Sequence, residues 1–181
     1  MPPGFDRPKG PVSAVVSPRT PVPRVGFGYD SHRFKKGRPL ILGGVRIPHD
    51  RGLEGHSDAD VLTHAVIDAL IGAAGRGDIG TWYSDRDPRF KNADSLKLLA
   101  DARRRTARVH EVVNVDATLL AETPRLGPYK NRIRARLARA LGVPPSRVNV
   151  KAKTNEGMGF VGRREGLAAL AVVALAPRVR S

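Results

Sequence analysis

The chain has 181 residues, enough for one domain with a sizeable core and few for two average domains. Hydrophobic residues make up 40% and charged residues 27%, which is typical of a folded globular protein. Cysteine is absent, so disulfides, thiolate metal sites and cysteine nucleophiles are excluded. No apolar run approaches the roughly 20 residues of a membrane span, and the start MPPGFDRPKG lacks the order of a secretory signal. We therefore expect a cytoplasmic protein with no membrane partner.

The net charge of +15 arises from 32 Lys and Arg against 17 Asp and Glu. Such a charge suits an anionic partner such as nucleic acid or a phosphate-bearing substrate. The arginines are scattered, however, and clusters such as residues 103–105 are spaced like solvated helix faces. Aromatic residues are only 5% and no basic patch is interleaved with them. We read the charge as a composition bias and expect no dedicated nucleic-acid binding.

Residues 1–23 contain seven prolines and no hydrophobic periodicity, which predicts a disordered or extended tail. From Arg24 the pattern changes. Apolar residues alternate in RVGFGYDSHRF, which indicates a strand. Residues 40–48 then read as a short hairpin that turns at Gly43 and Gly44.

The clearest helix is predicted in HSDADVLTHAVIDALIGAAGRGDIG, where Gly75 and Gly77 would end it. Ser57 would cap it and Asp60 would complete a capping box. Its apolar face comprises Leu62, Ala65, Val66, Ala69, Leu70 and Ala73.

Two further helices are predicted over residues 94–109 and 128–141, and strands over 113–119, 148–154 and 167–175. In the first of these strands Val113, Val115, Ala117 and Leu119 alternate on one face. Strands and helices alternate around one core without an internal repeat. We therefore expect a single domain over residues 24–177.

One group of residues carries metal chemistry. Asp30 and His32 stand two apart on a strand, so both side chains leave the same face. His64 belongs to a polar stripe of the predicted helix with Ser57, Asp60 and Asp68. A carboxylate and two imidazoles suffice for a catalytic zinc with an open fourth position. By spacing alone, surface residues on a strand and an unrelated helix histidine explain the pattern equally well.

Other polar residues gather in predicted loops. Residues 55–58 precede the helix N-terminus, a place that suits phosphate. Residues 84–88 contain Asp85 and Asp87, which the pattern alone explains as turn formers. Residues 153–157, KTNEG, offer a cation, a hydroxyl and a carboxylate at a strand end. They suit a diphosphate with a divalent metal, and a polar turn is the simpler alternative.

Five blocks occur in an order that resembles one enzyme family. They are GYDSHRF, LGGVRIP, GLEGHSDADVLTHAVIDALIGAAGRGDIG, DRDPRFKNADS and KAKTNEGMGFVGR. Together they look like the 2-C-methyl-D-erythritol 2,4-cyclodiphosphate synthases, over roughly residues 24–176. From the elements and the resemblance we expect an α+β fold, a two-layer sandwich of a mixed four-stranded sheet with helices on one face and a short hairpin.

The resemblance implies a site. Zn²⁺ would be held by Asp30, His32 and His64, and a second divalent cation, Mg²⁺ or Mn²⁺, by Glu156 with the substrate diphosphate. His56 and Thr154 would be catalytic, acting on the phosphates. The implied substrate-binding residues are Asp30, Ser31, His32, His56, Ser57, Asp78, Ile79, Gly80, Tyr83, Ser84, Asp85, Arg86, Asp87, Ala121, Glu122, Thr123, Pro124, Arg125, Leu126, Gly127, Lys153, Thr154, Asn155, Glu156, Phe160 and Arg163.

The resemblance also implies a reaction and an assembly. The reaction is the metal-assisted intramolecular phosphoryl transfer of the non-mevalonate (MEP) route of isoprenoid and terpenoid biosynthesis. This lyase reaction makes a cyclic diphosphate and CMP from a cytidine diphosphate substrate. The assembly is a homotrimer with active sites between subunits. Arg86, Lys153 and Arg164 depart from the pattern we expect of the family, the last where glycine is frequent.

Two other functions use the same residues. A different metal-dependent phosphoesterase could direct the Asp/His cluster at water, although the cytidine-pocket motifs argue against it. A basic nucleic-acid-binding protein could retain a degenerate site. Release of CMP without cyclic product would favour the first, and steeply salt-dependent duplex binding the second.

Overall fold

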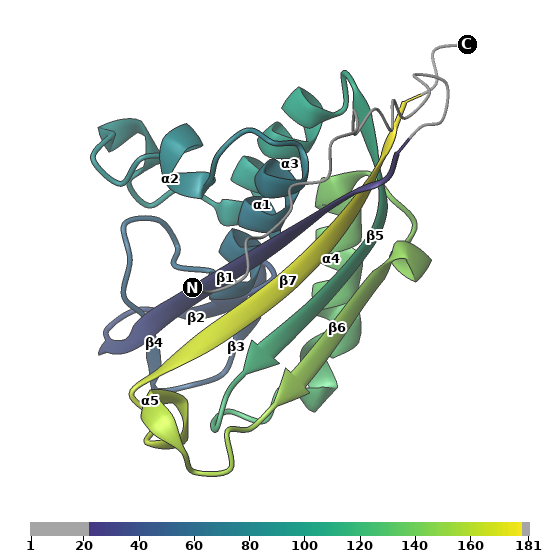
Figure 1. The fold of residues 1–181 in the computed structure, drawn as a ribbon. Coiled ribbons are helices and arrows are strands. Elements are labelled where there is room, and N and C mark those ends of the chain that lie inside the picture. The colour runs from purple at the N-terminus through teal and green to yellow at the C-terminus, as the bar shows by residue number, and fades with distance from the viewer. Residues whose placement is uncertain (1–21, 179–181) are drawn as a thin grey trace, which may run out of the picture.

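A computed structural model describes residues 22–178 (Figure 1). The predicted tail therefore lies almost wholly outside the described residues. A five-stranded mixed sheet has the order β4-β1-β7-β5-β6, and a separate two-stranded sheet pairs β2 with β3. The strands are β1 Arg24–Lys36, β2 Leu40–Leu42, β3 Val45–Ile47, β4 Arg51–Leu53, β5 His110–Leu120, β6 Val148–Lys153 and β7 Gly166–Pro177.

The helices α1, α3 and α4 cover one face of the large sheet, which makes the expected two layers (Figure 1). The α-helices are α1 Val61–Ala73, α2 Ile79–Trp82, α3 Ser95–Thr106, α4 Lys130–Leu141 and α5 Gly159–Gly162. Short 3-10 helices lie at η1 Pro88–Phe90, η2 Gly127–Tyr129 and η3 Pro145–Arg147. Among residues 22–178, no helix is long and apolar enough to cross a membrane.

The α+β fold and the hairpin are confirmed, with one strand more than the four expected. The long strand β1 pairs with β7 from Arg24 to Arg33. Its last residues, Phe34–Lys36, continue past that partner and pair with β4. Three residues without alternation carry almost no strand signal, which is why β4 is not evident in the sequence.

The predicted cap of the first helix was wrong. The helix begins at Val61, and its N-cap is Asp60, which accepts a hydrogen bond from the Thr63 amide at 3.1 Å. The same carboxylate accepts from the amides of Gly43 and Gly44 at 2.8 and 2.6 Å. Asp60 therefore ties the hairpin turn to the helix. Burial and the nearby charge of Asp58 raise the pKa of the Asp60 carboxyl, against the effect of these donors.

The predicted alternation in the strand at residues 113–119 was wrong at its first position. A β-bulge lies between Val112 and Asn114, so Val112 is buried and Val113 is exposed. One extra residue in a strand reverses the facing of every residue before it.

The contact between β1 and α1 is made by backbone rather than by side chains. A Cβ atom added at Gly26 would lie 2.0 Å from the carbonyl oxygen of Ala69, and one added at Gly28 would lie 2.0 Å from that of Ala65. Only glycine allows the strand to approach the helix so closely. The approach brings the next inward-facing residues of β1, Asp30 and His32, beside the first turns of α1.

We predict that Gly28→Ala lowers the free energy of unfolding by about 3 kcal/mol, because the helix backbone cannot move aside as a side chain can. Gly72→Ala is the matched control, since nothing lies within 4 Å of a Cβ at Gly72. It should raise stability by about 0.5–1 kcal/mol through helix propensity. Urea unfolding of both variants measures the difference, and equal stabilities would contradict the close contact.

Candidate active site

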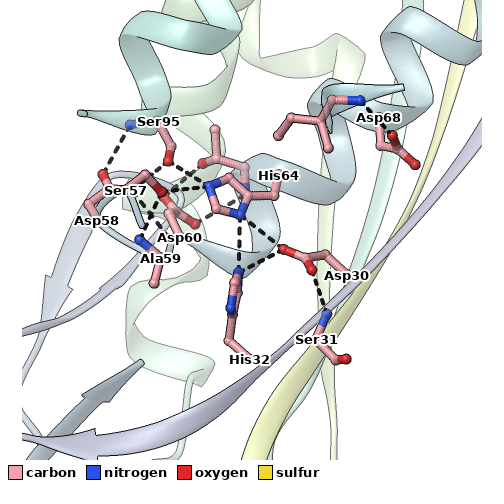
Figure 2. Close-up of polar contacts among 12 residues, drawn as sticks. Asp30, Ser31, His32, Ser57, Asp58, Ala59, Asp60, His64, Asp68 and Ser95 are labelled. Atoms are coloured by element: carbon pink, nitrogen blue, oxygen red, sulfur yellow. Dashed lines mark hydrogen bonds and ion pairs between the residues drawn. The ribbon is translucent and has the colours of Figure 1, made fainter. Parts of the chain in front are cut away.

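Three side chains converge where β1 crosses α1 (Figure 2). Asp30 Oδ2 lies 3.0 Å from His32 Nε2 and 3.0 Å from His64 Nδ1. The two imidazole nitrogens are 3.2 Å apart. All three residues are half-buried, and among residues 22–178 they form the only such cluster of potential metal ligands. The pairing that spacing alone left open is thus made by the fold.

The donor set fits a divalent transition metal. Ligand atoms about 2.0–2.1 Å from a tetrahedral zinc stand about 3.3 Å apart, a few tenths of an ångström more than the separations here. One carboxylate oxygen and two imidazole nitrogens leave a fourth position for a substrate oxygen. The cluster therefore has the composition and spacing of a catalytic metal site.

The charge states of the cluster also suit a cation. Burial disfavours ionisation of Asp30, but its hydrogen bonds with His32 and His64 outweigh burial and hold the pKa of the carboxyl well below its usual range. Burial likewise lowers the pKa of His64, and its hydrogen bond and attraction to Asp30 reverse this and raise it. These contacts favour the ionised carboxylate of Asp30, which is the form that binds a cation.

A cavity of about 350 Å³ opens beside the cluster. It is lined by both histidines, Asp30, Tyr29 and Asp68 together with the start of α2, residues 78–80. Asp68 Oδ1 accepts a hydrogen bond from the Ile79 amide at 3.0 Å, which fixes α2 against α1. The sequence-predicted residues Asp78, Ile79 and Gly80 therefore border the same cavity as the metal ligands.

A second cavity, of about 630 Å³, lies at the ends of β5 and β6. Its lining includes Lys153, Thr154 and most of the predicted residues 121–127. The two loops are joined because the Ala121 amide donates to the Lys153 carbonyl and the Asn155 amide donates to Glu122 Oε2, at 2.9 and 3.1 Å. The first and second cavities share no lining residue.

The exposed hydroxyl of Thr154 donates to Glu156 Oε1 at 2.6 Å. Glu156 adopts a positive φ of 49°, which turns the chain sharply after β6. Phe160, together with Ser31 and His32, lines a third, smaller cavity, and Arg163 Nε donates to Glu165 Oε1 at 2.7 Å.

The predicted site residues near α1 and α2 differ in burial and in hydrogen-bond partners. His56 Nε2 lies 3.3 Å from the carbonyl oxygen of Asp87, and Ser57 is buried. Tyr83 is buried, with its hydroxyl donating to Asp101 Oδ2 at 2.8 Å. Burial and this acceptor raise the pKa of Tyr83 above its usual range.

In the loop after Tyr83, Ser84 Oγ accepts from the Arg86 amide at 3.2 Å, and Asp85 and Arg86 are exposed. Asp87 pairs with Arg89, which lowers the pKa of the carboxyl, and caps η1.

The sequence did not reveal that Ser95 contacts His64, or that Asp58 contacts Ser95. Ser95, the first residue of α3, places its Oγ 2.9 Å from His64 Nε2. Asp58 accepts hydrogen bonds from both the amide and the hydroxyl of Ser95. Ser95 is 31 residues from His64, so no local pattern reveals this contact. By contrast, Gly26 and Gly28 in β1 are a sequence signal of close backbone approach between strand and helix.

A family model described as the YgbB family matches residues 23–176. The chain belongs to this family. A relative from Desulfatibacillum aliphaticivorans, named 2-C-methyl-D-erythritol 2,4-cyclodiphosphate synthase, is 56% identical over 84% of this chain and 99% of its own. One of the same name from Bordetella avium is 57% identical over 84% and 95%.

Solved structures agree. The chain resembles an IspF from Plasmodium falciparum in complex with CDP at 30% identity and a TM-score of 0.76, covering 87% of this chain and 97% of the other. It resembles a CDP-bound 2C-methyl-D-erythritol-2,4-cyclodiphosphate synthase at 38% identity and a TM-score of 0.77, covering 84% and 99%. The resemblance predicted from the five sequence blocks is confirmed, and the chain is an enzyme of this synthase family.

We predict that His64→Ala abolishes bound divalent metal while the protein stays folded, because two ligands cannot replace three. Elemental analysis of purified protein, with circular dichroism for the fold, measures both. His110→Ala is the control, since His110 lies outside the cluster. Full metal content in His64→Ala would contradict the ligand assignment.

Proposed function

We propose that this enzyme converts 4-diphosphocytidyl-2-C-methyl-D-erythritol 2-phosphate into 2-C-methyl-D-erythritol 2,4-cyclodiphosphate with release of CMP. The observation that carries the proposal is the Asp30, His32 and His64 cluster within a chain that matches these synthases along almost their whole length. The CDP in two similar structures supports a cytidine nucleotide as part of the substrate.

The reaction is an intramolecular phosphoryl transfer. An oxygen of the 2-phosphate forms a bond to the β-phosphorus of the same molecule. The bond from that phosphorus to the bridging oxygen breaks, and CMP leaves with the bond's electron pair. Most of the catalysis is alignment and charge neutralisation, because two anionic groups must approach each other. No side-chain nucleophile is needed, which agrees with a chain that lacks cysteine.

We assign zinc to the Asp30, His32 and His64 cluster and a second divalent cation, Mg²⁺ or Mn²⁺, to Glu156. Bound there, the two ions would act as Lewis acids that withdraw charge from phosphate oxygens. Asp30 and the histidines would orient the reacting phosphate through their fixed positions on β1 and α1. Zinc fits because imidazole and carboxylate are among its usual ligands and the fourth position is open.

The remaining predicted residues divide into four groups. His56 and Thr154 would be the catalytic residues that donate hydrogen bonds to the reacting phosphates. The first cavity, with residues 78–80 and the loop 83–87, would hold the methylerythritol part. The second cavity, with residues 121–127 and 153–156, would hold the cytidine diphosphate. Ser31, Ser57, Phe160 and Arg163 would complete the contacts.

The open face of the sheet supports a homotrimer. Val25, Phe27 and Tyr29 alternate along β1 with the buried Gly26 and Gly28, which face α1, so they lie on the opposite face of the sheet, and they are 67%, 60% and 50% exposed. Val172 of the neighbouring strand β7 adds to this patch at 38% exposure. A row of apolar side chains on an uncovered sheet face is a typical subunit interface. The separate cavities of one chain agree with active sites completed between subunits.

The proposed reaction predicts a coupled pair of products. Incubation with the substrate should yield cyclic diphosphate and CMP in equal amounts, measured by mass spectrometry. A chelator should abolish both, and added zinc with magnesium should restore them. CMP without cyclic product would instead indicate hydrolysis by water and overturn the cyclase assignment.

The proposed assembly predicts that Phe27→Asp converts the trimer to monomers, because a carboxylate cannot be buried unpaired at an interface. Sedimentation velocity measures the mass. Val109→Asp is the control, since Val109 is 46% exposed and lies outside the open sheet face. A trimer that survives Phe27→Asp would contradict this interface. A protein that is monomeric without any substitution would contradict it too.

A further inference from the structure

The half-buried Asp58 and the buried Ser95 form a hydrogen-bonded chain behind His64 that leads away from the cluster (Figure 2). Asp58, in the turn before α1, accepts the Ser95 hydroxyl at Oδ1 and the Ser95 amide at Oδ2, the latter at 3.0 Å. Ser95 is fully buried. Its Oγ lies 2.9 Å from His64 Nε2, on the opposite side of the ring from Asp30.

The direction of these hydrogen bonds follows from the chemistry of the groups. An ionised carboxylate only accepts, so the Ser95 hydroxyl must give its single hydrogen to Asp58. The Ser95 oxygen then faces His64 Nε2 with lone pairs alone. Nε2 must therefore carry a hydrogen and donate it to Ser95 Oγ. In the neutral ring this leaves the lone pair on Nδ1, the nitrogen that lies 3.0 Å from Asp30 Oδ2 and 3.2 Å from His32 Nε2.

We infer that Asp58 and Ser95 are positioning residues, which select the tautomer and orientation of His64 that bind the metal. This inference rests on the proposed metal site and assigns a role to two residues outside it. Ser57 Oγ is also near, 3.0 Å from His64 Nε2, but it accepts from the Ala59 amide and has no carboxylate partner to hold its hydrogen away from the ring. Only the Ser95 branch sets the direction of donation.

The arrangement makes the variant Asp58→Ala informative. Asp58 Oδ1 also accepts from the Asp60 amide at 3.3 Å, and alanine removes this acceptor together with both acceptors of Ser95. The Ser95 hydroxyl would then be free to turn its hydrogen toward His64 Nε2. That hydrogen bond favours the tautomer with the hydrogen on Nδ1, which cannot bind a metal through the same atom.

The test measures zinc dissociation constants by competition with a chromophoric chelator. We expect Ser95→Ala and Asp58→Ala each to weaken zinc binding by about 10–100-fold, as the loss of a residue that orients a ligand histidine does elsewhere. Thr106→Ala is the control, because Thr106 is a buried hydroxyl of the same helix α3 that donates only to backbone carbonyls. It should change the dissociation constant by less than about twofold.

A second readout separates positioning from folding. The visible absorption of the cobalt-substituted protein reports ligand geometry, and it should change in both variants while thermal unfolding in chelator stays cooperative. Dissociation constants and cobalt spectra equal to those of the unchanged protein would overturn the inference. If the protein without substitutions binds neither zinc nor cobalt, the proposed metal site itself is overturned, and the inference with it.

Discussion

The backbone contact between β1 and α1 is the constraint on which the site depends. Gly26 and Gly28 let the strand lie directly on the helix carbonyls of Ala69 and Ala65. Asp30 and His32, farther along β1, can therefore meet His64 across the gap between sheet and helix. A strand held one side-chain layer farther from α1 would separate Asp30 and His32 from His64 by several ångströms more. The closeness of the three metal-cluster side chains thus follows from this backbone contact.

Acidic side chains just before α1 and within it serve as structural links around this contact. Asp60 caps the helix and holds the β2–β3 turn. Asp58 holds the first residue of α3, and Asp68 holds the first residue of α2. Each carboxylate accepts backbone amides that would otherwise be unsatisfied at a helix start or a tight turn. Three neighbouring elements are therefore fixed relative to the helix that carries His64.

The molecule has two unlike faces, which bear on its charge. The sheet face away from the helices carries Val25, Phe27 and Tyr29, whereas α3 and α4 carry most of the clustered arginines. In α3, Arg104 and Arg105 pair with Asp101.

Arg164 adopts a positive φ of 59° at a position where the resemblance predicts glycine. Such a conformation costs an L side chain about 1 kcal/mol or more, so the departure from the family pattern carries a local strain.

The sequence by itself determined the family, the long elements and the Asp30, His32 and His64 set, because ordered motifs and hydrophobic period are local properties of the chain. It did not determine β4, the bulge at Val112, the true cap at Asp60 or the partners of His64. A three-residue edge strand has no period, and a cap depends on which carboxylate meets the helix amides in space. In the hydrogen-bonded series Asp58–Ser95–His64, Ser95 is 31 residues from His64 and 37 residues from Asp58. Only the packing of α3 against α1 decided that contact, since nothing in either segment alone specifies the other.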